Sequence, residues 1–235
     1  MLMKLKKNIS IIAVIMVTCV SGLWAGDTAS FVDLGFSPDG KSYMFGQYGV
    51  LSPALKPWAE IFVVDVAGND FVPNGKFSFT DNVPISAGQD GSGVFYRLVS
   101  ANSETASRHG INFQNQGQPL YISLDKNPPD SGETIEFRDF VFDKKYRAEL
   151  VSSVQGKEQN IKSSFFINLE SRTGNGQVKK YTIGNPRTVR AGVASYNIKK
   201  VLIDANGDSI IFVIEMKRFS DSGYNIRYMI EAQRL

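Results

Sequence analysis

The sequence has very little of the chemistry on which most enzyme and metal sites depend. Its 235 residues include one cysteine, Cys19, and one histidine, His109. A metalloprotease helix needs two histidines, and a structural zinc site needs several cysteines or histidines. No GxSxG elbow accompanies His109, so a Ser-His-Asp triad has no support either. We therefore expect no catalytic residue of these classes, no metal and no cofactor, and we interpret His109 as a cation near a helix end.

An excess of charge of one sign is also lacking once the first 25 residues are set aside. Those residues contain three lysines and no acid, which leaves 23 Lys and Arg against 23 Asp and Glu. The calculated pI of 8.8 therefore arises from the N-terminal segment. A neutral chain without a basic cluster cannot release many phosphate counterions, so nucleic-acid binding is not expected.

The N-terminal segment has the three-part order of a secretory signal peptide. Lysines 4, 6 and 7 precede an apolar run over 9–20, and small residues follow up to Ala25. The run is shorter than the ~20 residues of a membrane-spanning helix. We predict cleavage after about Ala25 and a periplasmic or secreted mature chain without a transmembrane segment. A retained anchor is one alternative, and lipidation at Cys19 is another, although Thr18 fits a lipobox poorly.

The body of the chain, residues 26–235, reads as a single secreted β-rich domain. Short alternating or apolar runs predict antiparallel strands at 59–66, 76–80, 119–125, 134–142, 146–154, 163–171, 178–183, 194–203 and 225–233. Helical spacing of apolar residues predicts one central helix at about 92–109. The segment 125–134 holds two prolines and a glycine among polar residues, and it is a candidate seam between two halves.

One phrase occurs near both ends of the chain, as GFSPDGKSYMF (35–45) and LIDANGDSIIF (202–212). Each copy places a tight turn between two apolar strands, with Asp39 and Gly40 in the first turn and Asn206 and Gly207 in the second. Glycine adopts the positive φ of such turns at little cost. A calcium loop is the alternative for DANGD, but its glycine is fourth where an EF-hand has it sixth. The phrase resembles the blade hairpins of TolB-type propellers.

A second resemblance covers nearly all of the mature chain. LGFSPDGKSYMFGQYGV (34–50), PWAEIFVVDVAGNDFV (57–72) and IRYMIEAQRL (226–235) are similar to an uncharacterised family of predicted secreted bacterial proteins. The chain departs from that family's pattern at the second turn and at FSDSGYN (219–225). The resemblance implies export and a shared fold, and it implies no chemistry.

Two sets of residues are candidates for a ligand site. Tyr43, Tyr48 and Trp58 are a candidate ligand groove, although aromatic residues on strands more often pack in a core. The carboxylates Asp130, Glu133, Glu136 and Asp139 form one acidic group, and Asp65 and Asp70 flank a strand end. A glycosidase would need two such acids across a cleft.

These observations favour an exported, non-catalytic binding or assembly protein of the periplasm or cell envelope. Its partner would be an envelope protein or an envelope polymer. The alternative is a carboxylate-dependent hydrolase that acts on an envelope polymer, because acids are the catalytic residue type that the mature chain retains in number.

Overall fold

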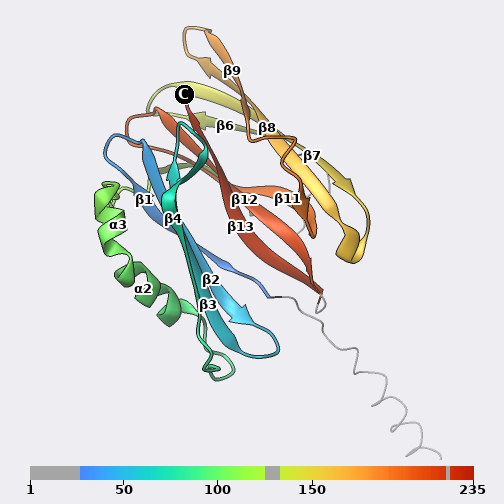
Figure 1. Cartoon of the computed structure of the whole chain (residues 1–235). Coiled ribbons are helices and arrows are strands. Elements are labelled where there is room, and N and C mark those ends of the chain that lie inside the picture. The colour runs from blue at the N-terminus through green and yellow to red at the C-terminus, as the bar shows by residue number, and fades with distance from the viewer. Residues whose placement is uncertain (1–26, 125–132, 221–222) are drawn as a thin grey trace, which may run out of the picture.

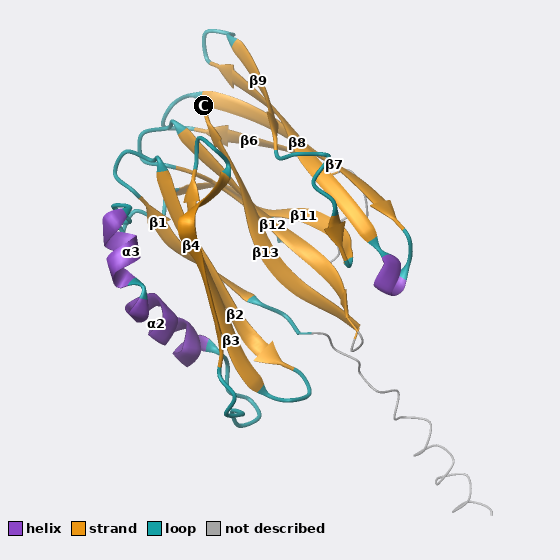
Figure 2. Cartoon of the chain, in the orientation of Figure 1, coloured by secondary structure: helices purple, strands orange, loops and turns teal. Residues whose placement is uncertain are grey.

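The fold consists of three antiparallel sheets and two α-helices (Figures 1 and 2). The computed structural model describes residues 27–124, 133–220 and 223–235. The predicted signal peptide lies outside these residues, as does most of the predicted seam at 125–134. The prediction of a mainly β, antiparallel fold is confirmed.

The N-terminal sheet contains four consecutive strands in the order β1-β2-β3-β4. Alternation along β2 gives the sheet two apolar faces, since successive side chains point to opposite sides. Met44 lies on the face that the helices cover, whereas Tyr43 and Phe45 lie on the face that packs against the next sheet. The strands are β1 (Ser30–Phe36), β2 (Ser42–Leu51), β3 (Lys56–Asp65) and β4 (Asp70–Thr80).

The sequence predicts one central helix at 92–109, but the structure has two helices in this segment. They are α2 (Ser92–Ala101) and α3 (Ser103–Arg108). Asn102 separates them: its side-chain amide donates to the Leu98 carbonyl at 2.8 Å, and its backbone N–H bonds to the Val99 carbonyl. Asparagine favours such local bonds over a continuous helix. Gly110 then ends α3 at φ +65°.

The central sheet has the order β13-β12-β11-β5 and is buried on both faces. Its two inner strands are therefore continuous apolar runs, VLI at 201–203 and IIFVI at 210–214, instead of alternating sequences. The strands are β5 (Gln118–Ile122), β11 (Val193–Ile203), β12 (Ser209–Ser220) and β13 (Gly223–Arg234).

The third sheet, called here the β6–β10 sheet, packs on the far side of the central sheet. Its inner face is apolar, with Leu150, Phe165 and Ile167 against Ile198 and Phe212 of the central sheet. Its outer face is polar. The elements are β6 (Glu133–Asp139), β7 (Lys144–Gln155), a 3₁₀ turn (Glu158–Asn160), β8 (Lys162–Thr173), β9 (Val178–Ile183) and β10 (Arg190–Ala191).

The helices and the three sheets form a stack of four layers, in the order helices, N-terminal sheet, central sheet and β6–β10 sheet (Figure 2). Over the described ranges the sheets form an open stack and no closed propeller. The last third of the chain therefore supplies most of the layer against which both outer sheets pack.

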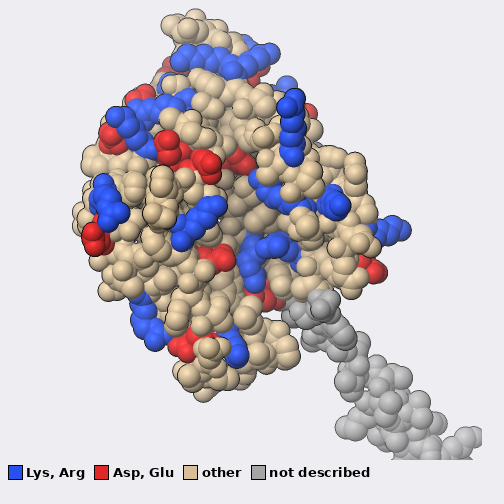
Figure 3. All heavy atoms as spheres, viewed as in Figure 1, with Lys and Arg blue, Asp and Glu red and all other residues tan. Residues whose placement is uncertain are grey.

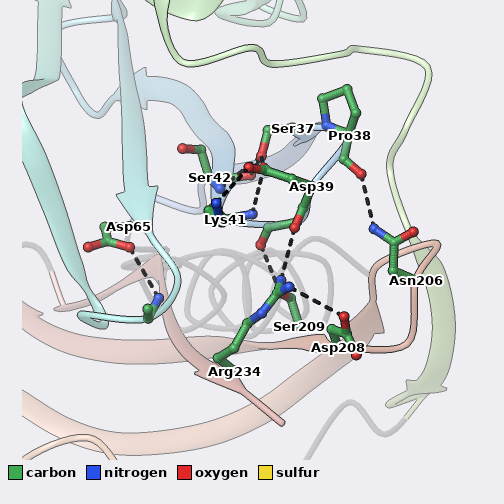
Figure 4. A network of polar contacts seen from close by, with 12 residues as sticks. Ser37, Pro38, Asp39, Lys41, Ser42, Asp65, Asn206, Asp208, Ser209 and Arg234 are labelled. Atoms are coloured by element: carbon green, nitrogen blue, oxygen red, sulfur yellow. Dashed lines mark hydrogen bonds and ion pairs between the residues drawn. The ribbon is translucent and has the colours of Figure 1, made fainter.

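The two related hairpins contact each other at one end of this stack (Figure 4). Asn206 donates to the Pro38 carbonyl at 3.0 Å, and the Ser209 hydroxyl donates to the Gly40 carbonyl at 2.8 Å. Arg234, near the chain end, donates to the Asp39 carbonyl at 3.0 Å. The repeated phrase thus joins the N-terminal sheet to the central sheet.

A third hairpin, between β6 and β7, lies beside these two. Asp139 is fully buried and accepts hydrogen bonds from the backbone N–H groups of Val141 and Phe142, much as Asp204 accepts from those of Asp208 and Ser209. The Phe142 ring lies against Gly207, where an added Cβ would be 2.6 Å from it. Each of the three sheets therefore contributes one hairpin to this end.

Candidate functional site

A cleft lies where the three sheets meet, over the last residues of β13. Its volume is about 560 Å³. One wall is the β3–β4 turn, the other is the segment after β9, and the floor is β13 from Met229 to Gln233. In Figure 3 the surface is hollowed between the part built on the N-terminal sheet and the part built on the β6–β10 sheet.

The outer edge of β13, which borders this cleft, is blocked by two side-chain amides from the N-terminal sheet. Gln47 accepts a hydrogen bond from the Tyr228 backbone N–H at 2.8 Å, and Asn69 accepts one from the Ala232 N–H at 2.6 Å. An unpaired strand edge would otherwise recruit another strand. The cleft is therefore suited to a ligand that contacts side chains, and not to a peptide that adds to the sheet.

Glu231 is the unusual residue of the cleft. It is only 4% exposed, although glutamate is rarely buried. Asn69 donates to its carboxylate at 2.5 Å, and Arg190 approaches it at 3.6 Å. Burial raises the pKa of Glu231, and the Asn69 and Arg190 interactions oppose that rise without cancelling it. The cleft thus holds a carboxyl group that accepts a proton more readily than an exposed glutamate.

Local backbone geometry brings both walls close to Glu231. Asn69 adopts φ +48°, a conformation that asparagine tolerates, and its one side chain bonds both Glu231 and the β13 backbone. Opposite it, Gly184 has φ +85°, and an added Cβ there would lie 3.1 Å from the Glu231 carboxylate. A larger residue at Gly184 would press on the carboxylate.

Arg190 is held in place by aromatic rings. Its guanidinium lies 4.9 Å from the Phe165 ring centre and 5.9 Å from that of Tyr196. The Tyr196 hydroxyl shares a 2.7 Å hydrogen bond with Ser163. This stacking fixes a cation beside Glu231, an arrangement for which arginine is well suited.

The remaining lining of the cleft combines polar side chains with apolar ones. The polar residues are Asp70, Thr182, Asn185, Thr188 and Gln233, and the apolar residues are Val64, Ala67, Phe71, Ile183, Met229, Ile230 and Ala232. Amides and hydroxyls both donate and accept hydrogen bonds, so they match the hydroxyl groups of a polar ligand.

The predicted aromatic groove is distributed over different parts of the fold. Tyr43 is completely buried between the N-terminal and central sheets, whereas Tyr48 lies on the opposite face and contacts Phe95 of α2 at 5.4 Å. The two are five residues apart on one strand, so the period of two places them on opposite faces. Trp58 is covered by Arg227, whose guanidinium lies 4.2 Å from its ring. The structure does not bring the three side chains together.

Trp58 belongs to a second buried cluster, near the other end of β13. Asp27 accepts hydrogen bonds from the Trp58 indole at 3.2 Å and from Arg227 at 2.5 Å. The Asp27 backbone N–H donates to Asn225 at 2.8 Å. These contacts join the start of the described chain to its last strand.

The predicted turn residues lie in the two hairpins. Gly40 has φ +67° and Gly207 has φ +73°. Asp39 accepts from the Ser37 hydroxyl at 2.7 Å, and Asn206 bonds across to the other hairpin. All four residues therefore lie at one end of the stack.

The predicted acidic groups are largely structural, and Glu231 was not among them. Asp139 caps a turn, Glu133 accepts from the Ile198 N–H at 2.9 Å, and Asp130 lies outside the described residues. Only Asp70 lines the cleft. The signal for Glu231 in the sequence is weak. Glu231 is a single acid in the strand YMIEAQ, and its burial depends on residues far away in the chain.

The described residues contain no cluster of three or more metal-binding side chains. Within the same residues, no helix is both long and apolar enough to span a bilayer.

Comparison with protein-family models gives a match over most of the chain. The family model described as predicted secreted protein (DUF2259) matches residues 44–234. The chain belongs to this family. The match covers the last strand and both walls of the cleft, whereas the GFSPDG phrase at 35–40 precedes it. No curated protein and no solved structure matches the chain.

Proposed function

We propose that this member of the secreted family is a non-catalytic binding protein of the periplasm or cell envelope. It holds a saccharide portion of an envelope polymer in the cleft over β13. The observation that carries the proposal is the buried Glu231 carboxyl, which lies between Asn69 and Arg190 in an open cleft. Burying a carboxyl costs free energy, so a function for it is the reasonable expectation.

A saccharide suits the cleft better than the other common ligand classes. Hydroxyl groups of a sugar pair with amide, carboxyl and hydroxyl side chains, and three amides, two carboxyls and two hydroxyls line the cleft beside its apolar residues. The volume of about 560 Å³ lies within the range of small-molecule sites. A peptide strand is disfavoured, since Gln47 and Asn69 occupy the β13 edge.

A second part of the proposal concerns the domain organisation of the chain and its relation to propeller blades. We take residues 26–235 as one secreted domain, after removal of a signal peptide near Ala25. Support comes from contacts between the chain ends, including those of Asp27 with Arg227. The three adjacent hairpins support a relation to TolB-type propeller blades, with an open stack in place of a ring.

A direct binding measurement tests the function. Calorimetric titration would use short oligomers of N-acetylglucosamine and of glucose as probes. We expect binding by the wild type, and at least about tenfold weaker binding by Glu231→Gln, since a charged hydrogen-bonding group is lost. Glu149→Gln, on the exposed outer face of the β6–β10 sheet, is the matched control and should bind like the wild type. If Glu231→Gln binds as tightly as the wild type, the cleft is not the site.

The hydrolase alternative has one specific observation in its favour. Glu231 has a raised pKa, as the acid of a glycosidase does, and Asp70 lines the same cleft. Assaying the same oligomers for new reducing ends separates the two functions. Binding without cleavage supports the binding protein, whereas wild-type cleavage that Glu231→Gln abolishes would replace it with the hydrolase.

A further inference from the structure

The β6–β7 turn carries two exposed apolar residues at its apex. Phe140 is 78% exposed and Val141 is 69% exposed. The turn is nevertheless well fixed, because buried Asp139 bonds its backbone and the Phe142 ring packs on Gly207. A rigid turn that presents adjacent apolar side chains to solvent indicates a contact surface.

Strand pairing places a row of like charges next to this turn. On the outer face of the β6–β10 sheet, Arg138 is directly opposite Lys145, and Lys145 is directly opposite Arg172. All three residues are exposed. Like charges facing each other across strands are destabilising. The row therefore costs stability in the free protein, and a bound anionic surface would remove that cost.

The neighbouring row of the same face does not bring like charges together. Two residues further along the strands, Glu136 faces Arg147, Arg147 faces Glu170, and Glu170 faces Lys180. Opposite charges alternate there, as expected for a solvated face. Only the row nearest the apolar turn brings cations together among the paired positions of β6, β7 and β8.

The acids near the row compensate it incompletely. Arg138 pairs with Asp143 at 2.7 Å, and Arg172 pairs with Glu170 at 3.3 Å. Lys145 lies between these two arginines, and exposed Val178 is opposite Arg172 on β9. We call the set Arg138, Phe140, Val141, Lys145 and Arg172 the basic tip. Blue side chains gather at the top of Figure 3, around the projecting β9 hairpin.

We propose that the basic tip docks on an anionic phospholipid surface. Phe140 and Val141 enter the interfacial region, while the cations contact lipid phosphates. The Arg138 guanidinium already lies 5.1 Å from the Phe140 ring centre, so the cation and the inserted ring move as a unit. A soluble polyanion would use the cations but not the apolar apex, and an apolar protein groove would not need the row of cations.

The proposal is independent of the saccharide cleft, since none of its residues lines that cleft. Peripheral binding of this kind adds a reversible contact to an exported protein. It should weaken with salt, because a few exposed cations attract the surface over a distance of about one Debye length.

Vesicle flotation tests it with the mature chain. Wild-type protein should float with vesicles of equal phosphatidylglycerol and phosphatidylcholine at low salt, and stay unbound with phosphatidylcholine alone or in about 0.5 M NaCl. The double variant Lys145→Glu/Arg172→Glu, and separately Phe140→Ser/Val141→Ser, should each lower the bound fraction about tenfold.

Two matched controls test whether the effect depends on where the apolar and charged side chains lie on the surface. Val83→Ser removes an apolar side chain that is 71% exposed on another part of the surface, and Lys157→Glu reverses an exposed charge beyond the far end of β7. Both should float like the wild type. Equal flotation with neutral vesicles, no flotation at all, or undiminished flotation of Phe140→Ser/Val141→Ser would each overturn the proposal. If Phe140→Ser/Val141→Ser still floats and Lys145→Glu/Arg172→Glu does not, the surface would instead be a site for soluble polyanions.

Discussion

At the scale of single residues, several acids are buried in this protein, and each has different partners. Asp27 pairs with Arg227, Asp139 and Asp204 cap turns, and Glu231 lies in the cleft. Asp33, on β1, has fewer partners: it accepts from the Gly35 N–H at 3.1 Å and lies 3.9 Å from Lys200. Burial raises its pKa to about 6, and Lys200, the Tyr43 hydroxyl and the Gly35 N–H only partly oppose this rise.

The raised pKa makes stability depend on pH in a direction that can be worked out. Between about pH 4 and pH 6 the folded protein binds a proton at Asp33 that the unfolded chain has released. The contribution of Asp33 to the free energy of unfolding therefore falls as pH rises through this window. For a shift of this size the loss is about 3 kcal/mol at pH 7.

Asp33→Asn should remove this dependence. Asparagine keeps an acceptor for the Gly35 N–H and carries no charge. We expect the variant to gain stability relative to the wild type between pH 4 and pH 7, by about 3 kcal/mol across the window. Urea unfolding at several pH values measures it. A difference between variant and wild type that is the same at pH 4 and pH 7 would contradict the assignment.

At the scale of elements, the hairpins fix how the sheets stack. Gly207 serves two purposes, because its φ of +73° forms the turn and its missing Cβ leaves room for the Phe142 ring. Gly176, in the β8–β9 turn, has a similar φ of +87° but nothing within 4 Å of an added Cβ. Substituting each of the two glycines therefore distinguishes the cost of backbone strain from the cost of disturbed packing.

Gly207→Ala should destabilise the protein more than Gly176→Ala does. Both variants carry the cost of a left-handed alanine, about 1 kcal/mol. Gly207→Ala also displaces Phe142, and we expect about 1 kcal/mol more from the disturbed contact. Chemical denaturation of both variants gives the comparison. Equal losses would mean that the hairpin contact contributes nothing to the stacking.

The sequence predicted most strands because their patterns are local. The runs at 59–66, 146–154 and 163–171 all fall inside or within one residue of observed strands. The third hairpin was missed because it has no glycine: Asp143 takes the left-handed conformation, at φ +46°. The helix break at Asn102 was missed because the apolar spacing continues up to that point.

The candidate site was less accessible to sequence reasoning. Glu231 is buried by Asn69, 162 residues earlier, and by a segment after β9, and no local pattern encodes such contacts. Tyr43 and Tyr48 lie on opposite faces of the sheet for a local reason, namely that they are separated by an odd number of positions on one strand. The face on which a strand residue lies can thus be predicted from the sequence, whereas the contact between three sheets cannot.

At the scale of the whole molecule, the central sheet joins the two outer ones. β13 is its edge strand, and it contributes Ile230 and Ala232 to the core shared with the N-terminal sheet. It also provides Arg227 and Arg234, which bond to Asp27 and Asp39. Its loss would expose β12 and free both chain ends together.

A chain that ends at Phe219 should therefore lose its cooperative structure entirely. We expect no thermal unfolding transition by circular dichroism, because the burial lost by both outer layers exceeds the small net stability of a domain. A chain shortened by Leu235 alone is the control and should unfold cooperatively. If the longer truncation kept a full transition, the two outer sheets would be stable without the last strand.

The contact between Asp27 and Arg227 spans 200 residues, and this has a consequence for export. A polypeptide that leaves the cytoplasm from its N-terminus delivers β1 to β4 long before β12 and β13. Until the final segment emerges, Tyr43 and Phe45 have no layer to cover them. In a secreted chain, the apolar face of the N-terminal sheet would therefore stay exposed until the last strands arrive, and such an exposed face promotes aggregation.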